Sequence, residues 1–181
     1  GVVAPLHRAA TDSTAARTQA LTKARFVANG PPDLALPAFA PAREAPPPRP
    51  LLEGAGLIVF SSGTTGDPKG AVVAHRRFDA KLDMIDGMLG FEDGARVLLV
   101  LQLTFSFGQW VSLLTLSHGG TLHMQSRFAP DAVVAALGRE RIQRAPFVPT
   151  MLRAMAPLAD PAWAGTIMAG GEVLPAPVAH Q

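Results

Sequence analysis

Short apolar runs alternate with segments of helical periodicity along most of the chain after residue 50. Continuous apolar runs predict buried strands at 57–60, 71–74, 96–101, 121–124, 145–148 and 166–169. Apolar positions at helical spacing predict helices between them, at 82–89, from 110 to near 119, from 130 onward and at 150–158. Strands that alternate with helices are typical of a mostly parallel sheet with helices on both faces, so the predicted fold class is α/β.

The first fifty residues follow a different pattern. An alanine-rich stretch at 11–28 predicts a helix. Residues 31–50 hold eight of the 17 prolines, and this run predicts an extended connector because proline lacks the backbone N–H that helices and central strands need. We therefore expect an N-terminal segment with a proline-rich connector, 1–50, followed by an α/β domain, 51–181.

The composition indicates a folded chain without a nucleic-acid partner. Hydrophobic residues make up 48% and charged residues 17% of the sequence, which is enough to form a buried core. The formal net charge is only +2, and the densest cationic run, at 139–144, is interrupted by Glu140, Ile142 and Gln143. Because a nucleic-acid site needs clustered cations, we interpret this run as a solvated helix end.

Cysteine is absent, which excludes disulfides, zinc–thiolate sites and a cysteine nucleophile. His118 and His123 lie on either side of a Gly-Gly turn without metal-ligand spacing, so we interpret both as structural and predict no metal-ligating residue in the sequence. No stretch reaches the ~18 apolar residues of a membrane span, and the first residues do not match a signal peptide. We expect a cytoplasmic protein.

The segment at 61–70 has the composition of an anion-binding loop. Its glycines allow successive backbone N–H groups to turn toward one anion, its hydroxyls add further donors, and its lysine supplies a positive charge for phosphate oxygens. These features predict a polyphosphate-binding loop made of Ser61, Ser62, Gly63, Thr64, Thr65, Gly66 and Lys69.

Other nucleotide-binding patterns fit this segment poorly. Counting from Gly63, Pro68 stands where a Walker loop requires its second glycine, and Gly70 stands where it requires a hydroxyl. The pair Gly54 and Gly56 precedes a predicted strand, whereas a dinucleotide fingerprint follows one. A P-loop ATPase and a dinucleotide-binding enzyme are therefore disfavoured.

The sequence Ser-Ser-Gly-Thr-Thr-Gly-Asp-Pro-Lys-Gly at 61–70 closely resembles the signature of the adenylate-forming superfamily. This superfamily comprises acyl- and aryl-CoA synthetases, adenylation domains of nonribosomal peptide synthetases and luciferases. Further similar segments lie at 1–6, 75–77, 103–108, 147–151 and 169–173. The resemblance covers 51–181 well and 1–50 thinly, and it implies part of the large N-terminal domain of an acyl-CoA synthetase type enzyme.

The resemblance implies that the enzyme joins a carboxylate to ATP, forming acyl-AMP and pyrophosphate, after which a thiol takes the acyl group. The thiol belongs to coenzyme A or to the phosphopantetheine of a carrier protein. Lys69 and Thr64 would be catalytic, and Thr64, Thr65, Gly66 and Lys69 would hold the β- and γ-phosphates. The adenine would lie against Gly171, Glu172 and Val173. The acid would contact Phe105, Ser106, Phe107 and Gly108.

The identity of the acid follows only in outline from the sequence. Amino-acid-activating relatives carry an Asp after the aromatic residue of the substrate segment, where this chain has Ser106. A neutral hydroxyl does not offset a buried ammonium, so the resemblance implies a fatty or aryl acid without an α-amino group.

The family's magnesium-binding Glu, ribose-binding Asp and C-terminal lysine would lie downstream of Gln181. We therefore expect the chain to be a fragment that is inactive by itself. Two alternatives remain open. One is a peptide-synthetase adenylation domain or acyl-AMP ligase, and the other is a non-catalytic nucleotide-binding remnant.

Overall fold

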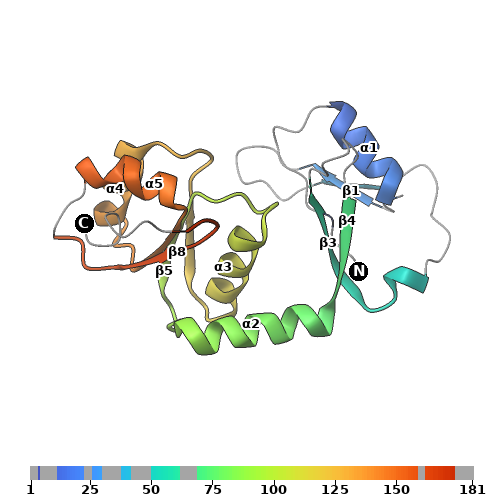
Figure 1. The fold of residues 1–181 in the computed structure, drawn as a ribbon, viewed down its shortest axis with the longest axis horizontal. Coiled ribbons are helices and arrows are strands. Elements are labelled where there is room, and N and C mark those ends of the chain that lie inside the picture. The colour runs from blue at the N-terminus through green and yellow to red at the C-terminus, as the bar shows by residue number, and fades with distance from the viewer. Residues whose placement is uncertain are drawn as a thin grey trace. The chain divides into compact units, whose positions relative to one another are not determined.

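The computed structural model describes residue 4 and residues 12–22, 26–29, 38–41, 50–61, 69–158 and 162–173. These residues fall into two compact units, Gly1–Arg76 and Arg77–Gln181. Figure 1 shows the helices and strands of both units. None of the helices in the described part of the chain is long and apolar enough to cross a lipid bilayer.

The first unit begins with helix α1, Asp12–Thr22, and a two-stranded antiparallel sheet of β1, Phe26–Asn29, and β2, Ala38–Pro41. The prediction of one helix through residue 28 is wrong in its last part, because residues 26–28 belong to β1. The β-branched and aromatic residues there favour a strand once a partner is present. Strand β2 lies inside the proline-rich stretch and is extended, as predicted. Its Pro41 is tolerated because both strands of this sheet are edge strands.

The second sheet of this unit is an antiparallel hairpin, preceded by the short 3₁₀ helix η1, Pro50–Leu52. Strand β3, Ala55–Ser61, pairs with β4, Lys69–Ala74, and the register joins Ser61 to Lys69 at the end of the ladder. The predicted strands at 57–60 and 71–74 are confirmed, with longer bounds. A Cβ on Gly56 would lie 2.7 Å from Nδ1 of His75, so only glycine allows the His75 ring to pack at this point of β3.

The second unit contains a four-stranded parallel sheet in the order β6-β5-β7-β8. Its strands confirm the four predicted runs to within two residues at each end. The pairing of β5 with β6 is parallel over its whole length, and so is the pairing of β7 with β8. The bounds are Arg96–Leu99 for β5, Thr121–Met124 for β6, Arg144–Phe147 for β7 and Thr166–Ala169 for β8.

Helices cover both faces of this sheet. Successive residues of a strand point to opposite faces, and along β5 Val97 and Leu99 join one buried cluster while Leu98 joins the other. The cluster of Val97 and Leu99 also contains side chains from α2 and α3, and the cluster of Leu98 contains side chains from α4 and α5. This arrangement confirms the α/β fold class. The helices span His75–Leu89 for α2, Ser106–Ser117 for α3, Pro130–Arg139 for α4 and Pro149–Met155 for α5, which continues as the 3₁₀ helix η2, Ala156–Leu158.

Candidate functional site

The hairpin of β3 and β4 fixes both ends of the segment predicted to bind phosphates. Ser61 closes β3 and its register partner Lys69 opens β4, so the intervening seven residues form the hairpin connection. Lys69 is exposed. Ser62, Gly63, Thr64, Thr65 and Gly66 lie outside the described residues, as does the side chain of Ser61.

Side-chain packing holds this end of the hairpin. A Cβ on Gly70 would lie 3.0 Å from Cγ2 of Ile58 and 3.2 Å from Cε1 of Phe60, so both β3 side chains pack over the glycine. Ile58 is buried. The base of the connection is therefore fixed by cross-strand hydrogen bonds and by packing, which leaves the Lys69 side chain exposed beside it.

The other predicted site residues lie in the second unit, where β5 and β8 end at the carboxyl edge of the parallel sheet. Ligands of such sheets bind in the loops at this edge. The connection after β5 leads to Phe105, Ser106, Phe107 and Gly108, and the turn after β8 holds Gly171, Glu172 and Val173. The two predicted segments thus follow strands of one sheet on the same edge.

Phe107 and Gly170 bring these two segments together. A Cβ on Gly170 would lie 2.9 Å from Cε1 of Phe107, so the ring rests against the bare glycine backbone. The N–H of Gly170 donates to the carbonyl oxygen of Phe147 at 3.2 Å, which fixes the start of the turn. The predicted acyl-binding and adenine-binding segments are therefore in direct contact.

The substrate segment forms the beginning of α3. Helix α3 starts at Ser106, four residues before the predicted start at Trp110. The backbone turns sharply here, since Phe105 N–H donates to the carbonyl oxygen of Gln102 at 3.2 Å. A Cβ on Gly108 would lie only 2.5 Å from that same oxygen. The helix thus begins where glycine permits close backbone contact, which apolar periodicity does not reveal.

The three aromatic residues of this region have different surroundings. Phe107 stacks on Trp110 with ring centroids 5.1 Å apart, and Trp110 meets Phe91 edge-on at 6.4 Å. Both Phe107 and Trp110 pack against the buried cluster between the sheet, α2 and α3. Phe105, in contrast, is 62% exposed. Of the three rings, only Phe105 is largely open to solvent at this edge.

Ser106 has a cationic neighbour that the sequence did not indicate. The ammonium group of Lys81, on α2, donates to Oγ of Ser106 at 2.8 Å. The two residues are 25 positions apart, and Lys81 occupies an ordinary polar position of α2, so neither spacing nor motif marks the contact. It becomes visible only when α2 packs beside α3.

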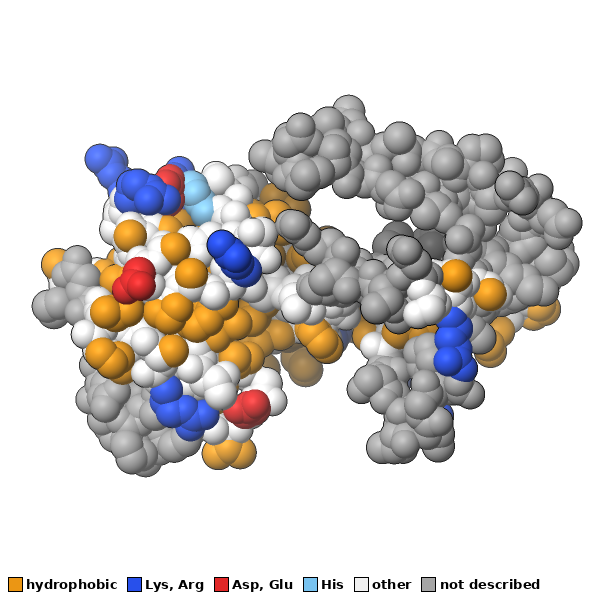
Figure 2. Space-filling view, turned by 90° about the horizontal axis from the view of Figure 1, so that it is seen from above, with side chains coloured by type: hydrophobic (Ala, Val, Ile, Leu, Met, Phe, Trp, Pro, Cys, Tyr) orange, Lys and Arg blue, Asp and Glu red, His pale blue; other side chains and the backbone are white. Residues whose placement is uncertain are grey.

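The turn after β8 presents backbone and exposed side chains. Gly171 has φ +91°, a left-handed conformation that favours glycine, and a Cβ there would lie 3.2 Å from Cγ1 of Val148. Glu172 and Val173 are exposed, the latter by 90%. Hydrophobic side chains cover much of the visible surface of the second unit in Figure 2. The exposed apolar residues include Leu103 and Phe105 after β5 and Val173 after β8.

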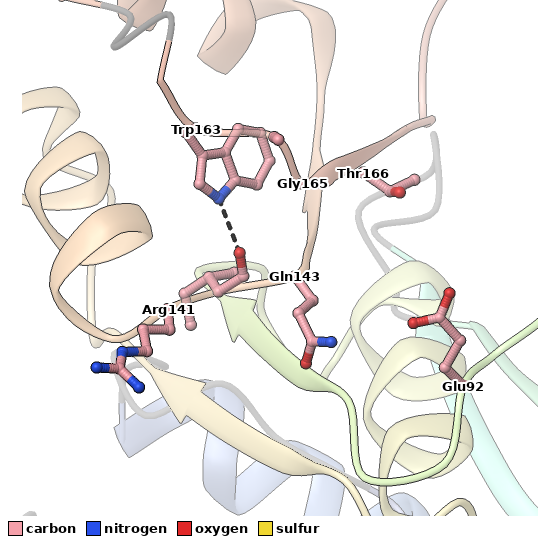
Figure 3. Close-up of a pocket in the computed structure, with 8 residues that line it drawn as sticks. Glu92, Arg141, Gln143, Trp163, Gly165 and Thr166 are labelled. Atoms are coloured by element: carbon pink, nitrogen blue, oxygen red, sulfur yellow. Dashed lines mark hydrogen bonds between the residues drawn. The ribbon is translucent and has the colours of Figure 1, made fainter.

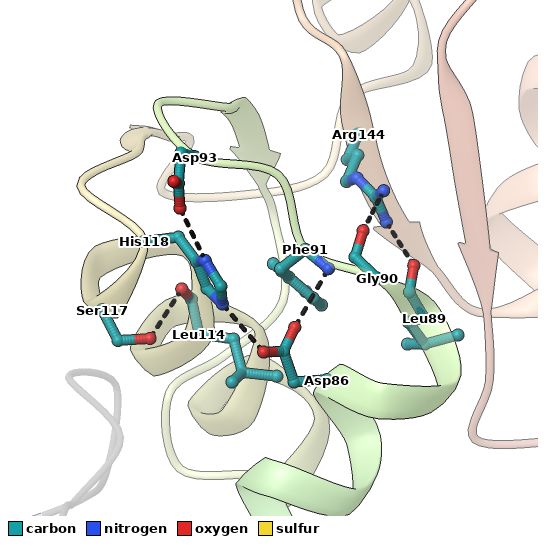
Figure 4. Close-up of polar contacts among 9 residues, drawn as sticks. All are labelled: Asp86, Leu89, Gly90, Phe91, Asp93, Leu114, Ser117, His118 and Arg144. Atoms are coloured by element: carbon teal, nitrogen blue, oxygen red, sulfur yellow. Dashed lines mark hydrogen bonds and ion pairs between the residues drawn. The ribbon is translucent and has the colours of Figure 1, made fainter.

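A network of charged side chains lies at the opposite, amino-terminal edge of the sheet (Figure 4). His118, after α3, contacts Asp93 through Nδ1 at 3.0 Å and Asp86 through Nε2 at 2.9 Å. These hydrogen bonds, that to Asp93 foremost, raise the pKa of His118. The N–H of Phe91 donates to Asp86, and this bond together with the one to His118 lowers the pKa of Asp86. The network joins α2 to the end of α3, which is consistent with a structural histidine.

The structure also has a recess at this amino-terminal edge, lined by residues that include Glu92, Arg141, Gln143 and Thr166 (Figure 3). Trp163 forms one wall, and its Nε1 donates to the carbonyl oxygen of Ile142 at 2.7 Å. Because ligands of open parallel sheets bind at the carboxyl edge, we do not assign the site to this recess. Among the residues that the structure describes, no three acidic or histidine side chains are grouped so that they could hold a metal ion.

One comparison, with a protein-family model, covers nearly the whole chain. The family model described as AMP-binding enzyme matches residues 3–181. A feruloyl-CoA synthase from Amycolatopsis sp. is 34% identical over 150 residues, which is 77% of this chain and 30% of that protein. An NRPS-like tryptophan epimerase, fscC, from Fusarium equiseti is 34% identical over 121 residues, covering 67% of this chain and 8% of that protein.

Solved structures with the same fold include an o-succinylbenzoate CoA synthetase from Bacillus subtilis in complex with ATP and a magnesium ion. It matches with a TM-score of 0.61 at 25% identity, over 68% of this chain and 26% of that one. The chain thus spans less than a third of the length of each of these three proteins.

Proposed function

This chain belongs to the family of AMP-binding enzymes, together with adenylate-forming CoA synthetases and peptide-synthetase relatives, and on that premise we propose that the protein activates a carboxylic acid with ATP. In the proposed step, a carboxylate oxygen attacks the α-phosphorus of ATP. The new P–O bond gives acyl-AMP, and the bond to the β-phosphate breaks, so that pyrophosphate leaves with the electron pair. A thiol then attacks the acyl carbon, and AMP leaves.

The register of Ser61 with Lys69 is the observation that carries this proposal. This register pairs the two described residues that flank the segment proposed to bind phosphates, and Lys69 is exposed. A cation and hydrogen-bond donors beside the leaving pyrophosphate stabilise its developing charge. We assign this role to Lys69 and Thr64, and binding of the β- and γ-phosphates also to Thr65 and Gly66.

The second unit supplies the proposed acyl and adenine contacts. Phe105, with its exposed ring, and the neighbouring Ser106, Phe107 and Gly108 would border the acid. The backbone of Gly171, Glu172 and Val173 would border the adenine. The contact of Phe107 with Gly170 supports this pairing, since acyl and adenylate groups must lie side by side in one intermediate.

Magnesium accompanies ATP in the related o-succinylbenzoate CoA synthetase structure. The residues described in this structure offer no group of side chains that could hold the ion. When bound with ATP, magnesium would neutralise phosphate charge. The proposed contributions of this chain, which are phosphate contacts from Lys69 and the hydroxyl-rich loop, do not depend on a protein ligand to the metal.

The proposed substrate is an aryl or fatty acid without an α-amino group, and the proposed acceptor is coenzyme A. The resemblance to a feruloyl-CoA synthase supports an aromatic acid and this acceptor. A carrier-protein phosphopantetheine is the second candidate acceptor, favoured by the similarity to an NRPS-like protein. Exposed apolar residues at the carboxyl edge, Leu103 and Phe105 among them, are suited to a largely apolar acyl group.

The test is to incubate the protein in its natural full length with ATP, magnesium and a panel of aryl, fatty and amino acids, with and without coenzyme A. We expect AMP and pyrophosphate to form only when an accepted acid is present, and an acyl-CoA to form when coenzyme A is added. Formation of ADP and phosphate would contradict the proposal. Nucleotide binding without turnover of any acid would identify a non-catalytic module instead.

A further inference from the structure

The contact between Lys81 and Ser106 places a positive charge on the substrate segment. The ammonium nitrogen lies 2.8 Å from Oγ of Ser106, which is exposed, while Lys81 is half-buried. The hydroxyl oxygen accepts this hydrogen bond and limits where the long lysine side chain can point. The charge therefore has a defined position at the start of α3.

The position of Ser106 relates this charge to the proposed acyl site. Ser106 lies between the exposed Phe105 and Phe107, whose ring rests against Gly170 at the same edge of the sheet. Lys81 belongs to the same unit as all of these residues. The ammonium group is therefore attached to the segment that we assign to the acid.

Among the residues that the structure describes, no carboxylate forms an ion pair with Lys81. Within the part of the chain that the structure describes, no carboxylate oxygen lies within 4.0 Å of the Lys81 ammonium. Asp79 and Asp83 are two positions away on α2, and residues at this spacing point to different sides of a helix. A cationic substrate group near Ser106 would meet a like charge that no described carboxylate pairs with.

On the basis of the proposed function, we propose that Lys81 is a specificity-determining residue that excludes acids with an α-ammonium group. Repulsion between like charges a few ångströms apart at a partly solvated site weakens binding by about tenfold or more. Aryl and fatty acids without an ammonium group do not experience this repulsion. Lys81 thus adds active discrimination at a position where Ser106 by itself supplies no charge.

The test compares 3-phenylpropanoate with phenylalanine, two acids that differ only in the α-ammonium group. The ratio of their kcat/KM values in pyrophosphate exchange is measured for the full-length wild-type protein and for Lys81→Glu, Lys81→Met and Lys81→Arg. We expect wild type and Lys81→Arg to favour 3-phenylpropanoate. Lys81→Glu should lower the ratio at least about tenfold, mainly through KM, and Lys81→Met should lie between.

Arg153→Glu, at an exposed position of α5, is the matched control because it changes the net charge by the same amount. It should leave the ratio unchanged, and an equal effect there would overturn the proposal. An unchanged ratio in Lys81→Glu, with exchange intact, would refute the role of Lys81 and leave the adenylation proposal standing. The absence of exchange with every acid in the wild-type protein would refute both.

Discussion

The ring of Phe107 rests on the backbone of Gly170, at a point where an added Cβ would come within 2.9 Å of Cε1. The contact joins the first turn of α3 to the turn that follows β8, although the two residues are far apart in sequence. Phe107 is in turn stacked on Trp110 at 5.1 Å. The proposed acyl and adenine segments are thereby connected to the same buried cluster. A substitution that shifts one segment should therefore also shift the other.

Gly170→Ala should disturb this contact. The new methyl group would force Phe107 away from its stacked position, at an expected cost of about 1–3 kcal/mol in the free energy of unfolding. Thermal or denaturant unfolding measures the loss. Gly138→Ala on α4 is the control, since nothing lies within 4 Å of its added Cβ. Phe107→Leu should partly rescue Gly170→Ala, and additive effects of the two substitutions would contradict the proposed contact.

Lys69→Ala should separate catalysis from folding. Lys69 is exposed, so its loss should leave the unfolding temperature within about a degree of wild type, in line with other surface substitutions. The rate of acyl-AMP formation should fall by ~10²-fold, because a contact to the leaving pyrophosphate is removed. Single-turnover kinetics and thermal unfolding on the same samples test both statements. A large loss of stability would show instead that Lys69 supports the hairpin.

Arg144 should be important for stability. Its guanidinium donates to the carbonyl oxygens of Leu89 and Gly90 at the end of α2, and its side chain is only 9% exposed. Arg144→Met would leave both carbonyls without these donors, and we expect a loss of about 2–3 kcal/mol in unfolding free energy. Arg153→Met, at an exposed position of α5, should change stability by less than about 0.5 kcal/mol. Equal effects in denaturant unfolding would contradict a stabilising role of the bonds from Arg144 to Leu89 and Gly90.

The His118 network should make stability depend on pH. The pKa of His118 is raised above 6.5 by Asp93 and Asp86, so its stabilisation is complete below pH 6.5 and is lost as the pH rises through the raised value. The pKa of Asp86 is lowered below 3.8 by the Phe91 N–H and His118, so that contribution is present above pH 3.8 and is lost in acid. Thermal unfolding should therefore show a stability maximum between these limits.

His118→Gln is the variant that checks this assignment. Glutamine retains hydrogen-bonding capacity but cannot become charged, so the difference in unfolding temperature from wild type should be largest below pH 6.5 and shrink in mildly alkaline solution. A difference that is independent of pH would show that the charge of His118 does not stabilise the fold.

The strands of the second unit could be predicted from sequence because each is a short, largely apolar run, and in the central strands β5 and β7 residues on both faces are buried. Val97 and Leu98, for instance, point into different clusters. The helix prediction for residues 26–28 failed because local composition does not reveal a strand whose stability depends on pairing with 38–41. The start of α3 was missed because it depends on Gly108 lying close to Gln102, a contact invisible to periodicity.

The candidate site shows the same division. Contiguous motifs such as the segment at 61–70 and the Gly-Gly pair at 170–171 could be proposed as site residues from sequence because each motif is local. Lys81 and Arg144 act across 25 and 55 residues of sequence, and no local pattern marks such partners. These contacts form only when α2 packs against the sheet and α3, so they could be identified only from the three-dimensional structure.

Isotope transfer from the acid to AMP most directly tests the proposal that the carboxylate attacks the α-phosphorus of ATP. The full-length protein is incubated with ATP, magnesium, coenzyme A and an accepted acid labelled with ¹⁸O in its carboxylate, and the products are analysed by mass spectrometry. If the carboxylate attacks the α-phosphorus, one labelled oxygen appears in the phosphoryl group of AMP, and pyrophosphate is unlabelled. Label in inorganic phosphate, or AMP formed without label, would contradict an acyl-adenylate intermediate and with it the function proposed for this chain.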